Sequence, residues 1–179
     1  MVLYGAENLT RQQQAHDLLA RAAEACWGLS PLPSLDRGPH GKPFFPGQRG
    51  REFNLSHSGT LALCALSAAP VGVDIQVVRA WRPTLPQRVC SPRELAWLEQ
   101  EGDLWERFCR LWALKECLVK QQGTGLTRPI SGIQVPLPGA SDTLLEQNGL
   151  WFRTYQGAGW WGAACGQEQP PETIRWITL

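Results

Sequence analysis

The stretch LWALKECLVKQQGTGL, residues 111–126, decides the fold, because it joins a charged helix face to an apolar one and ends on glycines. Asp103 and Glu106 have the spacing of a helix start, and Gly123 is typical of a helix end. We therefore predict a helix over about residues 104–122. Apolar residues at helical spacing predict its buried stripe. The stripe comprises Leu104, Phe108, Leu111, Trp112, Leu118 and Val119.

The polar side of this helix carries Lys115, Glu116 and Lys120. Trp112, Glu116 and Lys120 are four residues apart and therefore share one face, whereas Lys115 projects about a quarter turn away. Trp112 lies on the apolar stripe and is interpreted as core. A Glu and a Lys at this spacing often form a solvated surface pair that contributes only about 0.2–0.5 kcal/mol. The charged residues alone therefore leave open whether this face does chemistry.

Asp74 favours a chemical role for this helix face over a solvated surface pair. The segment VGVDIQVV, residues 71–78, alternates apolar and polar residues like a strand, and aspartate is rare in strands. A buried carboxylate needs a cation, and Asp74 with Glu116 would suit Mg²⁺, which takes one or two carboxylates, waters and substrate phosphates. The alternative is an edge-strand aspartate that faces water.

A second apolar run, TLALCALS at residues 60–67, precedes this strand. We predict that the two form a hairpin that turns near residue 69 and pairs Asp74 near Leu63. His57 would then lie on the order of 10 Å or more from Asp74, too far to share one metal ion. Ser56, His57 and Asp74 are also the residue types of a hydrolase triad. Adjacent Ser and His point to opposite faces of a strand, however, and the sequence has no G-x-S-x-G motif.

The rest of the chain has the pattern of short helices and strands. A strand at residues 2–4 leads to a helix that starts at a Thr10 and Gln13 capping box and ends at Trp27. Ser91 and Glu94 form a second capping box. Residues 28–52 are interpreted as loop, a helix is predicted over residues 92–100, and strands are predicted at residues 133–135, 150–155, 160–165 and 174–177.

The composition bounds the class of protein. With 179 residues and 43% hydrophobic content, the chain can bury one sizeable core or two small half-domains. A net charge of +1 excludes a global field that would attract nucleic acid or an anionic membrane, and no apolar run is long enough to span a bilayer. The six cysteines contain no C-x-x-C pair and are interpreted as free thiols. We therefore expect a soluble, cytoplasmic protein that binds neither nucleic acid nor membrane.

Four motifs follow one another along the chain: GKP at residues 41–43, FNLSHSG at 53–59, GVDI at 72–75, and LWALKECLVKQQGTGL. In this order and spacing they resemble the 4'-phosphopantetheinyl transferases, in particular the larger monomeric type represented by the surfactin-synthetase activator. The resemblance implies an enzyme that transfers the 4'-phosphopantetheine arm of coenzyme A to a serine of an apo acyl or peptidyl carrier protein. It further implies Mg²⁺ as cofactor, adenosine 3',5'-bisphosphate as the released product, and a monomer.

The same resemblance implies an α+β fold of two similar halves related by a pseudo-twofold axis. The halves would be residues 1–69 and 70–179, with the metal site in the second half and the coenzyme A cleft between the two. The expected metal ligands are Asp74, Glu116 and Gln76. The expected coenzyme contacts are Lys42, Ser56, His57 and Lys120.

Two residues of the helix carry the expected catalysis. Lys120 matches the lysine that contacts the transferred phosphate, where charge builds as the serine oxygen attacks. Glu116, or a water on the metal, is the candidate base for the serine proton. The role of Lys115 stays open between a structural salt bridge and a coenzyme contact.

Gln76 departs from the family pattern, because the family often has an acid at this position. Its amide oxygen could still ligate Mg²⁺ or orient a metal-bound water, but without charge. This departure motivates an alternative function, a catalytically degenerate protein that binds coenzyme A or a carrier protein. The joint presence of Asp74, Glu116 and Lys120 argues against that alternative.

The first helix departs from the family pattern as well. Gln12 and Asp17 stand where basic residues that hold the coenzyme 3'-phosphate are expected, and the segment before the helix is shorter than in typical relatives, which predicts one helix fewer in the first half. The candidates to replace the missing bases are Arg11, Arg21 and Arg37.

Overall fold

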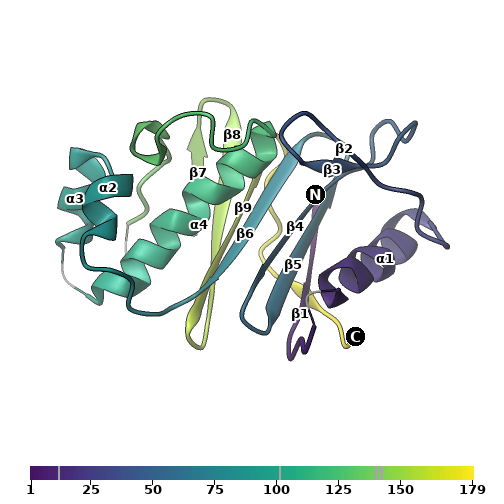
Figure 1. Ribbon diagram of the computed structural model, residues 1–179, viewed down its shortest axis with the longest axis horizontal. Coiled ribbons are helices and arrows are strands. Elements are labelled where there is room, and N and C mark those ends of the chain that lie inside the picture. The colour runs from purple at the N-terminus through teal and green to yellow at the C-terminus, as the bar shows by residue number, and fades with distance from the viewer. Residues whose placement is uncertain (12, 101, 140, 142) are drawn as a thin grey trace.

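The computed structural model describes residues 1–11, 13–100, 102–139, 141 and 143–179. Two four-stranded sheets lie in the middle of the molecule, with one long helix on the outer side of each (Figure 1). The helices are α1 (Gln14–Trp27), α2 (Leu85–Val89), α3 (Pro92–Leu98), α4 (Leu104–Gln122) and the 3-10 helix η1 (Ile130–Gly132). The strands are β1 (Val2–Ala6), β2 (Asp36–Arg37), β3 (Pro43–Phe44), β4 (Glu52–Ser58), β5 (Leu61–Ser67), β6 (Val71–Val77), β7 (Leu144–Gln147), β8 (Leu150–Gly157), β9 (Trp160–Gly166) and β10 (Arg175–Trp176). The predicted α+β class is confirmed.

The first sheet has the strand order β10-β1-β5-β4, and α1 covers one of its faces. Alternation along β5 turns Ala62, Cys64 and Leu66 toward α1, whose Leu18 and Leu19 are fully buried in the same cluster. Strand β10 pairs in parallel with β1. The last strand of the chain therefore returns to the sheet that the first strand begins.

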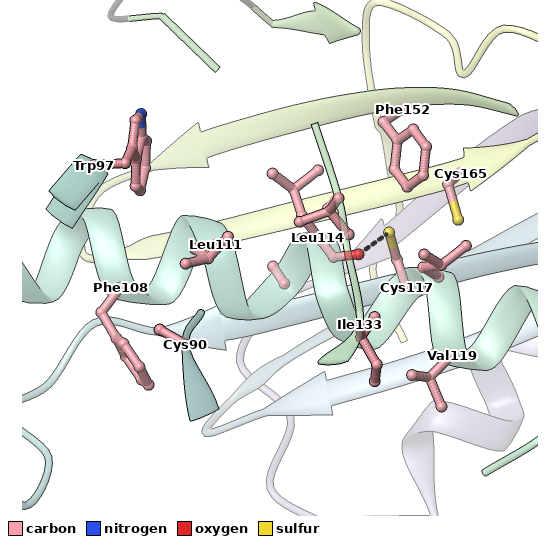
Figure 2. Close-up of a cluster of buried hydrophobic side chains, with 14 of the residues drawn as sticks. Cys90, Trp97, Phe108, Leu111, Leu114, Cys117, Val119, Ile133, Phe152 and Cys165 are labelled. Carbon is pink, nitrogen blue, oxygen red and sulfur yellow. Dashed lines mark hydrogen bonds between the residues drawn. The ribbon is translucent and has the colours of Figure 1, made fainter. Parts of the chain in front are cut away.

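The second sheet has the strand order β6-β9-β8-β7, and α4 covers one of its faces. Leu114 and Cys117 of the helix belong to one buried cluster with Phe152 of β8 and Cys165 of β9 (Figure 2). At Gly72 on β6, an added Cβ would lie 1.8 Å from the carbonyl oxygen of Cys117. Only a residue without a side chain allows β6 and α4 to approach this closely.

A third apolar cluster fills the space between the two sheets. It joins Leu3 of β1 and Leu63 of β5 to Val73 and Ile75 of β6 and Ala164 of β9. The layers of the molecule are therefore α1, the first sheet, the second sheet and α4 (Figure 1). No helix in the described part of the chain is long and apolar enough to cross a membrane.

The predicted hairpin between β5 and β6 is wrong. Strand β5 pairs with β4 and β1, while β6 pairs with β9, so that Leu63 lies opposite Ser56 and Asp74 opposite Ala163. Residues 68–70 carry the chain from the first sheet to the second. Both strands are apolar on the face that meets the inter-sheet core, and this pattern does not select the neighbour with which each strand pairs.

The long helix is confirmed, with α4 running from Leu104 to Gln122. The Asp103 side chain accepts hydrogen bonds from the backbone N–H groups of the second and third helical residues, and Gly123 ends the helix with a φ of 66°. Leu104 is exposed, so the predicted stripe is wrong at that one position. Trp112 packs against the buried cluster under α4, which agrees with its interpretation as core.

The start of α1 differs from the predicted capping box. The helix begins at Gln14, and the Gln13 side chain makes no capping bond. The Gln14 side chain instead reaches back, and its Oε1 accepts from Thr10 N at 2.7 Å and from Arg11 N at 3.0 Å. The loop predicted over residues 28–52 contains the short ribbon of β2 and β3.

Other local predictions divide between confirmed and wrong. The capping box at Ser91 and Glu94 is present at the start of α3. Residues 133–135 do not form a strand, although Ile133 and Val135 are buried under α4. All six cysteines are free thiols, and of these only Cys26 is exposed.

Candidate functional site

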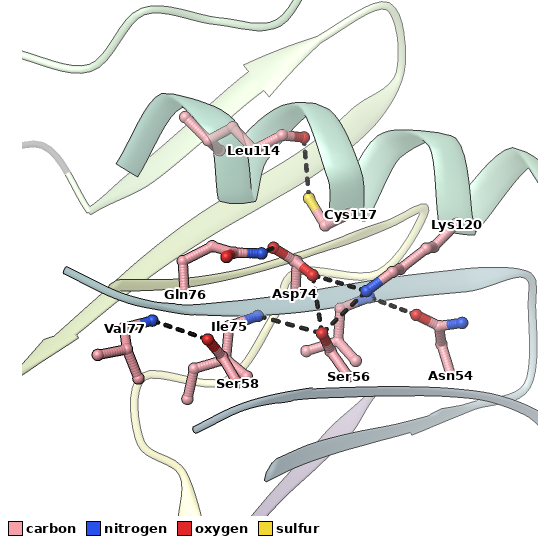
Figure 3. Close-up of polar contacts among 11 residues, drawn as sticks. Asn54, Ser56, Ser58, Asp74, Ile75, Gln76, Val77, Leu114, Cys117 and Lys120 are labelled. Atoms are coloured by element: carbon pink, nitrogen blue, oxygen red, sulfur yellow. Dashed lines mark hydrogen bonds and ion pairs between the residues drawn. The ribbon is translucent and has the colours of Figure 1, made fainter. Parts of the chain in front are cut away.

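Two edge strands meet where the sheets adjoin. Strand β4 ends the first sheet, β6 ends the second, and side chains of β4 accept hydrogen bonds from backbone N–H groups of β6. The bonds run from Val73 N to Asn54 Oδ1 (2.9 Å), from Ile75 N to Ser56 Oγ (3.4 Å) and from Val77 N to Ser58 Oγ (3.0 Å) (Figure 3). We call this row of three contacts the seam. In each bond the two residues are 19 positions apart in the sequence, and this constant separation means that the two strands run in parallel.

Asp74 lies beside the seam and is only 2% exposed. Its Oδ1 accepts from Lys120 Nζ at 2.6 Å and from Ser56 Oγ at 2.7 Å, and its Oδ2 accepts from Gln76 Nε2 at 2.7 Å (Figure 3). Lys120 Nζ also donates to Ser56 Oγ at 2.9 Å. The structure thus brings together four of the predicted site residues, and a buried carboxylate with a cation replaces the alternative of an aspartate that faces water.

Glu116 lies one helical turn before Lys120 on α4 and is partly buried. Burial raises the pKa of the Glu116 carboxyl, the negative charge of Asp74 raises it further, and the positive charge of Lys120 opposes both. The carboxylates of Glu116 on α4 and Asp74 on β6 are therefore close enough to interact electrostatically.

The chemistry of this corner fits a small hard cation. Asp74 and Glu116 offer carboxylate oxygens and Gln76 an amide oxygen, which are ligand types that Mg²⁺ accepts. Within the described ranges, no three His, Cys, Asp or Glu side chains form a group that could hold a metal ion. A metal at this corner would therefore need water, the Gln76 amide or a ligand phosphate to complete its shell.

A cavity of about 240 Å³ opens beside Lys120, between β4, the loop before β3 and the C-terminal end of α4. Its described lining holds two lysines and no carboxylate, so its charge favours an anion. A Cβ at Gly123 would lie 3.2 Å from Lys42 Cδ, and a Cβ at Gly125 would lie 3.4 Å from His40 Cβ. The two glycines thus let the loop lie close to the end of the helix.

Lys42 lines this cavity, but its ammonium is engaged with the backbone. Lys42 Nζ donates to the carbonyl oxygen of Val71 at 3.1 Å and to that of Gln121 at 3.2 Å. Burial lowers the pKa of the Lys42 ammonium. The side chain ties the GKP loop to β6 and α4, and its contact with a phosphate stays a prediction.

His57 does not share the strand face of Ser56. Phe53 and Leu55 on the same strand pack in the cluster under α1, and the exposed His57 follows their alternation. The phosphate contact proposed for His57 is therefore not explained by the seam. In the first helix Asp17 is exposed, and Gln12 lies outside the described residues.

The question left open for Lys115 is answered by a buried ion pair. Lys115 Nζ lies 2.8 Å from Glu94 Oε2, and their side chains are 2% and 4% exposed. The ammonium also donates to the carbonyl oxygens of Val89 at 3.1 Å and Ile130 at 2.9 Å. Lys115 is thus a structural residue that ties α4 to α2, α3 and η1.

Sequence reasoning missed three residues of this region: Asn54, Ser58 and His40. The signal for the first two is the alternation N-x-S-x-S within FNLSHSG, where polar residues recur at the period of a strand beside apolar Phe53 and Leu55. His40 carries no comparable signal, because it reaches the cavity through the fold of its loop.

The chain is similar in sequence to proteins of one family. Residues 70–165 match a family described as the 4'-phosphopantetheinyl transferase superfamily. The chain is 32% identical over 147 residues to a 4'-phosphopantetheinyl transferase of Bacillus subtilis and 29% identical over 147 residues to 4'-phosphopantetheinyl transferase Sfp of Bacillus subtilis strain 168, covering 78% of this chain and 66% of each relative. It is 42% identical over 131 residues to 4'-phosphopantetheinyl transferase AcpT of Salmonella typhi, covering 69% of this chain and 63% of that relative. The matched region is therefore slightly less than two thirds of the length of these relatives.

Proposed function

The chain belongs to the 4'-phosphopantetheinyl transferase superfamily, and from that premise we propose that it transfers the 4'-phosphopantetheine arm of coenzyme A to a serine of an apo carrier protein. The second product would be adenosine 3',5'-bisphosphate. The observation that carries the proposal is the cluster of Asp74, Lys120 and Ser56 at the edge of an anion-favouring cavity, with Glu116 beside it.

Lys120 is the residue proposed to stabilise the transferred phosphate. Attack by a serine oxygen on the pyrophosphate of coenzyme A breaks the bond to the leaving phosphate and builds negative charge on the oxygens between them. An ammonium that is already oriented by Asp74 and Ser56 needs little reorganisation to meet this charge.

Glu116 is the proposed base. Its raised pKa, caused first by burial and then by Asp74, brings its proton affinity closer to that needed to take a proton from the serine hydroxyl near neutral pH. A water held at the same corner is the alternative base.

We propose Mg²⁺ as the metal, held by Asp74 and Glu116, with Gln76 as a neutral third ligand. When bound, it would offset the charge of the pyrophosphate and polarise the phosphorus that is attacked. Gln76 lies beside Asp74, to whose Oδ2 its Nε2 donates at 2.7 Å, so ligation through its Oε1 would require the amide group to turn.

We propose that coenzyme A lies between two halves, residues 1–69 and 70–179, related by a pseudo-twofold axis. The cavity supports this position, because its lining includes residues of the GKP loop and β4 on one side and of α4 on the other. Of the candidates for the 3'-phosphate, Arg37 is favoured, because its guanidinium donates to the carbonyl oxygen of Gly41 at the cavity wall. Lys42, Ser56 and His57 remain proposed coenzyme contacts. We also propose that the protein is a cytoplasmic monomer.

The second candidate function is a protein that binds coenzyme A or a carrier without catalysis. It is favoured by one observation, the neutral Gln76 in place of an acid. A pure binder would not need Asp74, Glu116 and Lys120 together at one corner.

Intact-mass spectrometry tests the proposal. Apo peptidyl carrier protein and apo acyl carrier protein of fatty-acid synthesis are each incubated with the protein, coenzyme A and Mg²⁺. A gain of one phosphopantetheine group that disappears with a chelator is the expected result, and it also ranks the carriers. No gain on either carrier, with coenzyme A still bound, would instead support the binding protein.

Variants locate the chemistry. Glu116→Ala and Asp74→Ala should each lower the transfer rate by about 10²-fold or more, and Lys120→Ala should also lower it. Gln122→Ala, at an exposed position of the same helix, is the matched control and should transfer at the wild-type rate. Full activity of Glu116→Ala with unchanged Mg²⁺ dependence would refute the assigned site.

A further inference from the structure

Asn54 has two ends with different surroundings. The residue is 4% exposed, and its Oδ1 is taken by the seam bond from Val73 N at 2.9 Å. Its Nδ2 has no hydrogen-bond partner among the described residues. Polar groups of a buried residue are usually paired, so this nitrogen marks a place where water or a ligand atom is expected to accept.

The unpaired nitrogen belongs to a residue that lines the cavity. Among the described side chains, Trp81 Nε1 is the one nitrogen or oxygen that is both sealed from solvent and unpaired, so Asn54 Nδ2 is not sealed. Asn54 belongs to the lining of the 240 Å³ cavity beside Lys120, and Figure 3 shows its amide nitrogen directed away from the seam. Because the amide group is planar, the bond to Val73 fixes the direction in which the nitrogen donates.

The charge of the cavity indicates the ligand atom. Lys42, Lys120 and His40 contribute to the lining, and no carboxylate does so among the described residues. An amide N–H beside two ammonium groups is matched by an anionic oxygen, because phosphate oxygens accept several hydrogen bonds at once.

We propose that Asn54 is a ligand-binding residue whose Nδ2 donates to a phosphate oxygen of the molecule in this cavity, and whose Oδ1 holds β6 at the same time. The inference rests on the proposed function, under which that molecule is coenzyme A. Asn54 then couples occupation of the cavity to the strand that carries Asp74, because its seam partner Val73 directly precedes Asp74.

Ser58 offers a matched control. It makes the same kind of seam bond as Asn54, to Val77 N at 3.0 Å, but it does not belong to the cavity lining. Ser58→Ala therefore reports the loss of a seam bond alone. Asn54→Asp keeps an oxygen for Val73 N and replaces the donor with a negatively charged oxygen, whereas Asn54→Ala removes both the acceptor and the donor and adds no charge.

The test is calorimetric titration of the full-length protein and the three variants with coenzyme A and with pantetheine, which lacks the phosphates, together with the melting temperature of each. We expect Asn54→Asp to weaken coenzyme A binding by at least about tenfold and Asn54→Ala by about threefold or more, since one hydrogen bond to a charged group is worth a factor of this order. Ser58→Ala should lower the melting temperature and leave the coenzyme A affinity within about twofold of wild type. In the transfer reaction, the Asn54 variants should raise KM for coenzyme A more than they lower kcat.

Several outcomes would overturn the inference. Unchanged coenzyme A affinity in Asn54→Asp would show that the nitrogen makes no contact. Equal losses of affinity in Asn54→Ala and Ser58→Ala would assign the effect to the seam, and equal losses for pantetheine and coenzyme A would exclude a phosphate contact. Failure of the wild-type protein to bind coenzyme A would instead overturn the proposed function, and the Asn54 contact with it.

Discussion

Lys115→Met tests whether the buried ion pair under α4 is structural. The substitution removes an ammonium that is 2% exposed and 2.8 Å from Glu94 Oε2, and it leaves that carboxylate without its cation. It also removes the donor to the carbonyl oxygens of Val89 and Ile130, at 3.1 and 2.9 Å. The only hydrogen bond left to the Glu94 carboxylate among the described residues comes from Ser91 N, at 2.6 Å.

The expected loss follows from the burial of both partners. Removing one partner of a buried pair costs about 3–5 kcal/mol, because the remaining charge is uncompensated in a medium of low polarity. For a protein of this size, each kcal/mol lowers the melting temperature by about 2–4 °C. Lys115→Met should therefore melt about 6–20 °C below wild type in thermal unfolding followed by circular dichroism. Its affinity for coenzyme A should stay near that of wild type at a temperature where both are folded.

A double variant separates charge from packing. Glu94→Gln keeps an oxygen that can accept from Ser91 N, so Glu94→Gln with Lys115→Met removes both charges and retains the start of α3. The double variant should be more stable than Lys115→Met alone, since the stranded carboxylate is gone. The reasoning is refuted if Lys115→Met loses less than about 1 kcal/mol, a loss typical of an exposed pair. A tenfold loss of coenzyme A affinity at unchanged stability would make Lys115 a coenzyme contact instead.

Three further changes test the corner around Asp74. Gly72→Ala should lower the free energy of unfolding by about 3 kcal/mol or more in urea, because its Cβ would lie 1.8 Å from the carbonyl oxygen of Cys117, and a melting temperature unchanged within about 2 °C would contradict this contact. Gln76→Glu replaces the donor to Asp74 Oδ2 by a carboxylate, so it should destabilise the metal-free protein and gain more stability from Mg²⁺ than wild type does; equal Mg²⁺ shifts would place residue 76 outside the metal site. Burial raises the pKa of Glu116 above 4.5, so the folded protein holds this proton more tightly than the unfolded chain, and the stability due to Glu116 is lost as pH rises through the raised pKa. The difference in unfolding free energy between wild type and Glu116→Gln, without metal, should fall from about pH 4.5 upward, and a flat difference would refute it.

Local sequence features predicted the elements that depend on local interactions. Helix α4 follows from the Asp103 start, the Gly123 end and apolar spacing, all of which act within a few residues of the chain. The pairing of β6 was not predictable in this way, because its partner β9 follows 83 residues after the end of β6. The alternation of Val73 and Ile75 indicates a strand with one apolar face but contains no information on which neighbour the strand takes.

The residues of the candidate site were found from motifs, while their arrangement came only from the fold. Asp74, Glu116 and Lys120 are charged residues in apolar surroundings, which makes them visible in the sequence. Asn54 and Ser58 are small polar residues of an ordinary kind. Their role depends on β6, a strand of the other sheet that is not paired with β4 through the backbone among the described pairs. The N-x-S-x-S alternation becomes meaningful only when the unpaired edge of β6 is known.

The seam gives a physical reason for the position of the site. An edge strand presents backbone N–H groups that need partners, and continuing the sheet would satisfy those of β6 with backbone carbonyl oxygens. Side chains of β4 satisfy them here, and a hydroxyl can accept from the backbone while it also donates to another group. Ser56 does both, since its Oγ accepts from Ile75 N and Lys120 Nζ and donates to Asp74 Oδ1. The joint between the sheets thereby orients the carboxylate and the ammonium on which the proposed chemistry depends, which a seam of backbone pairs would not do.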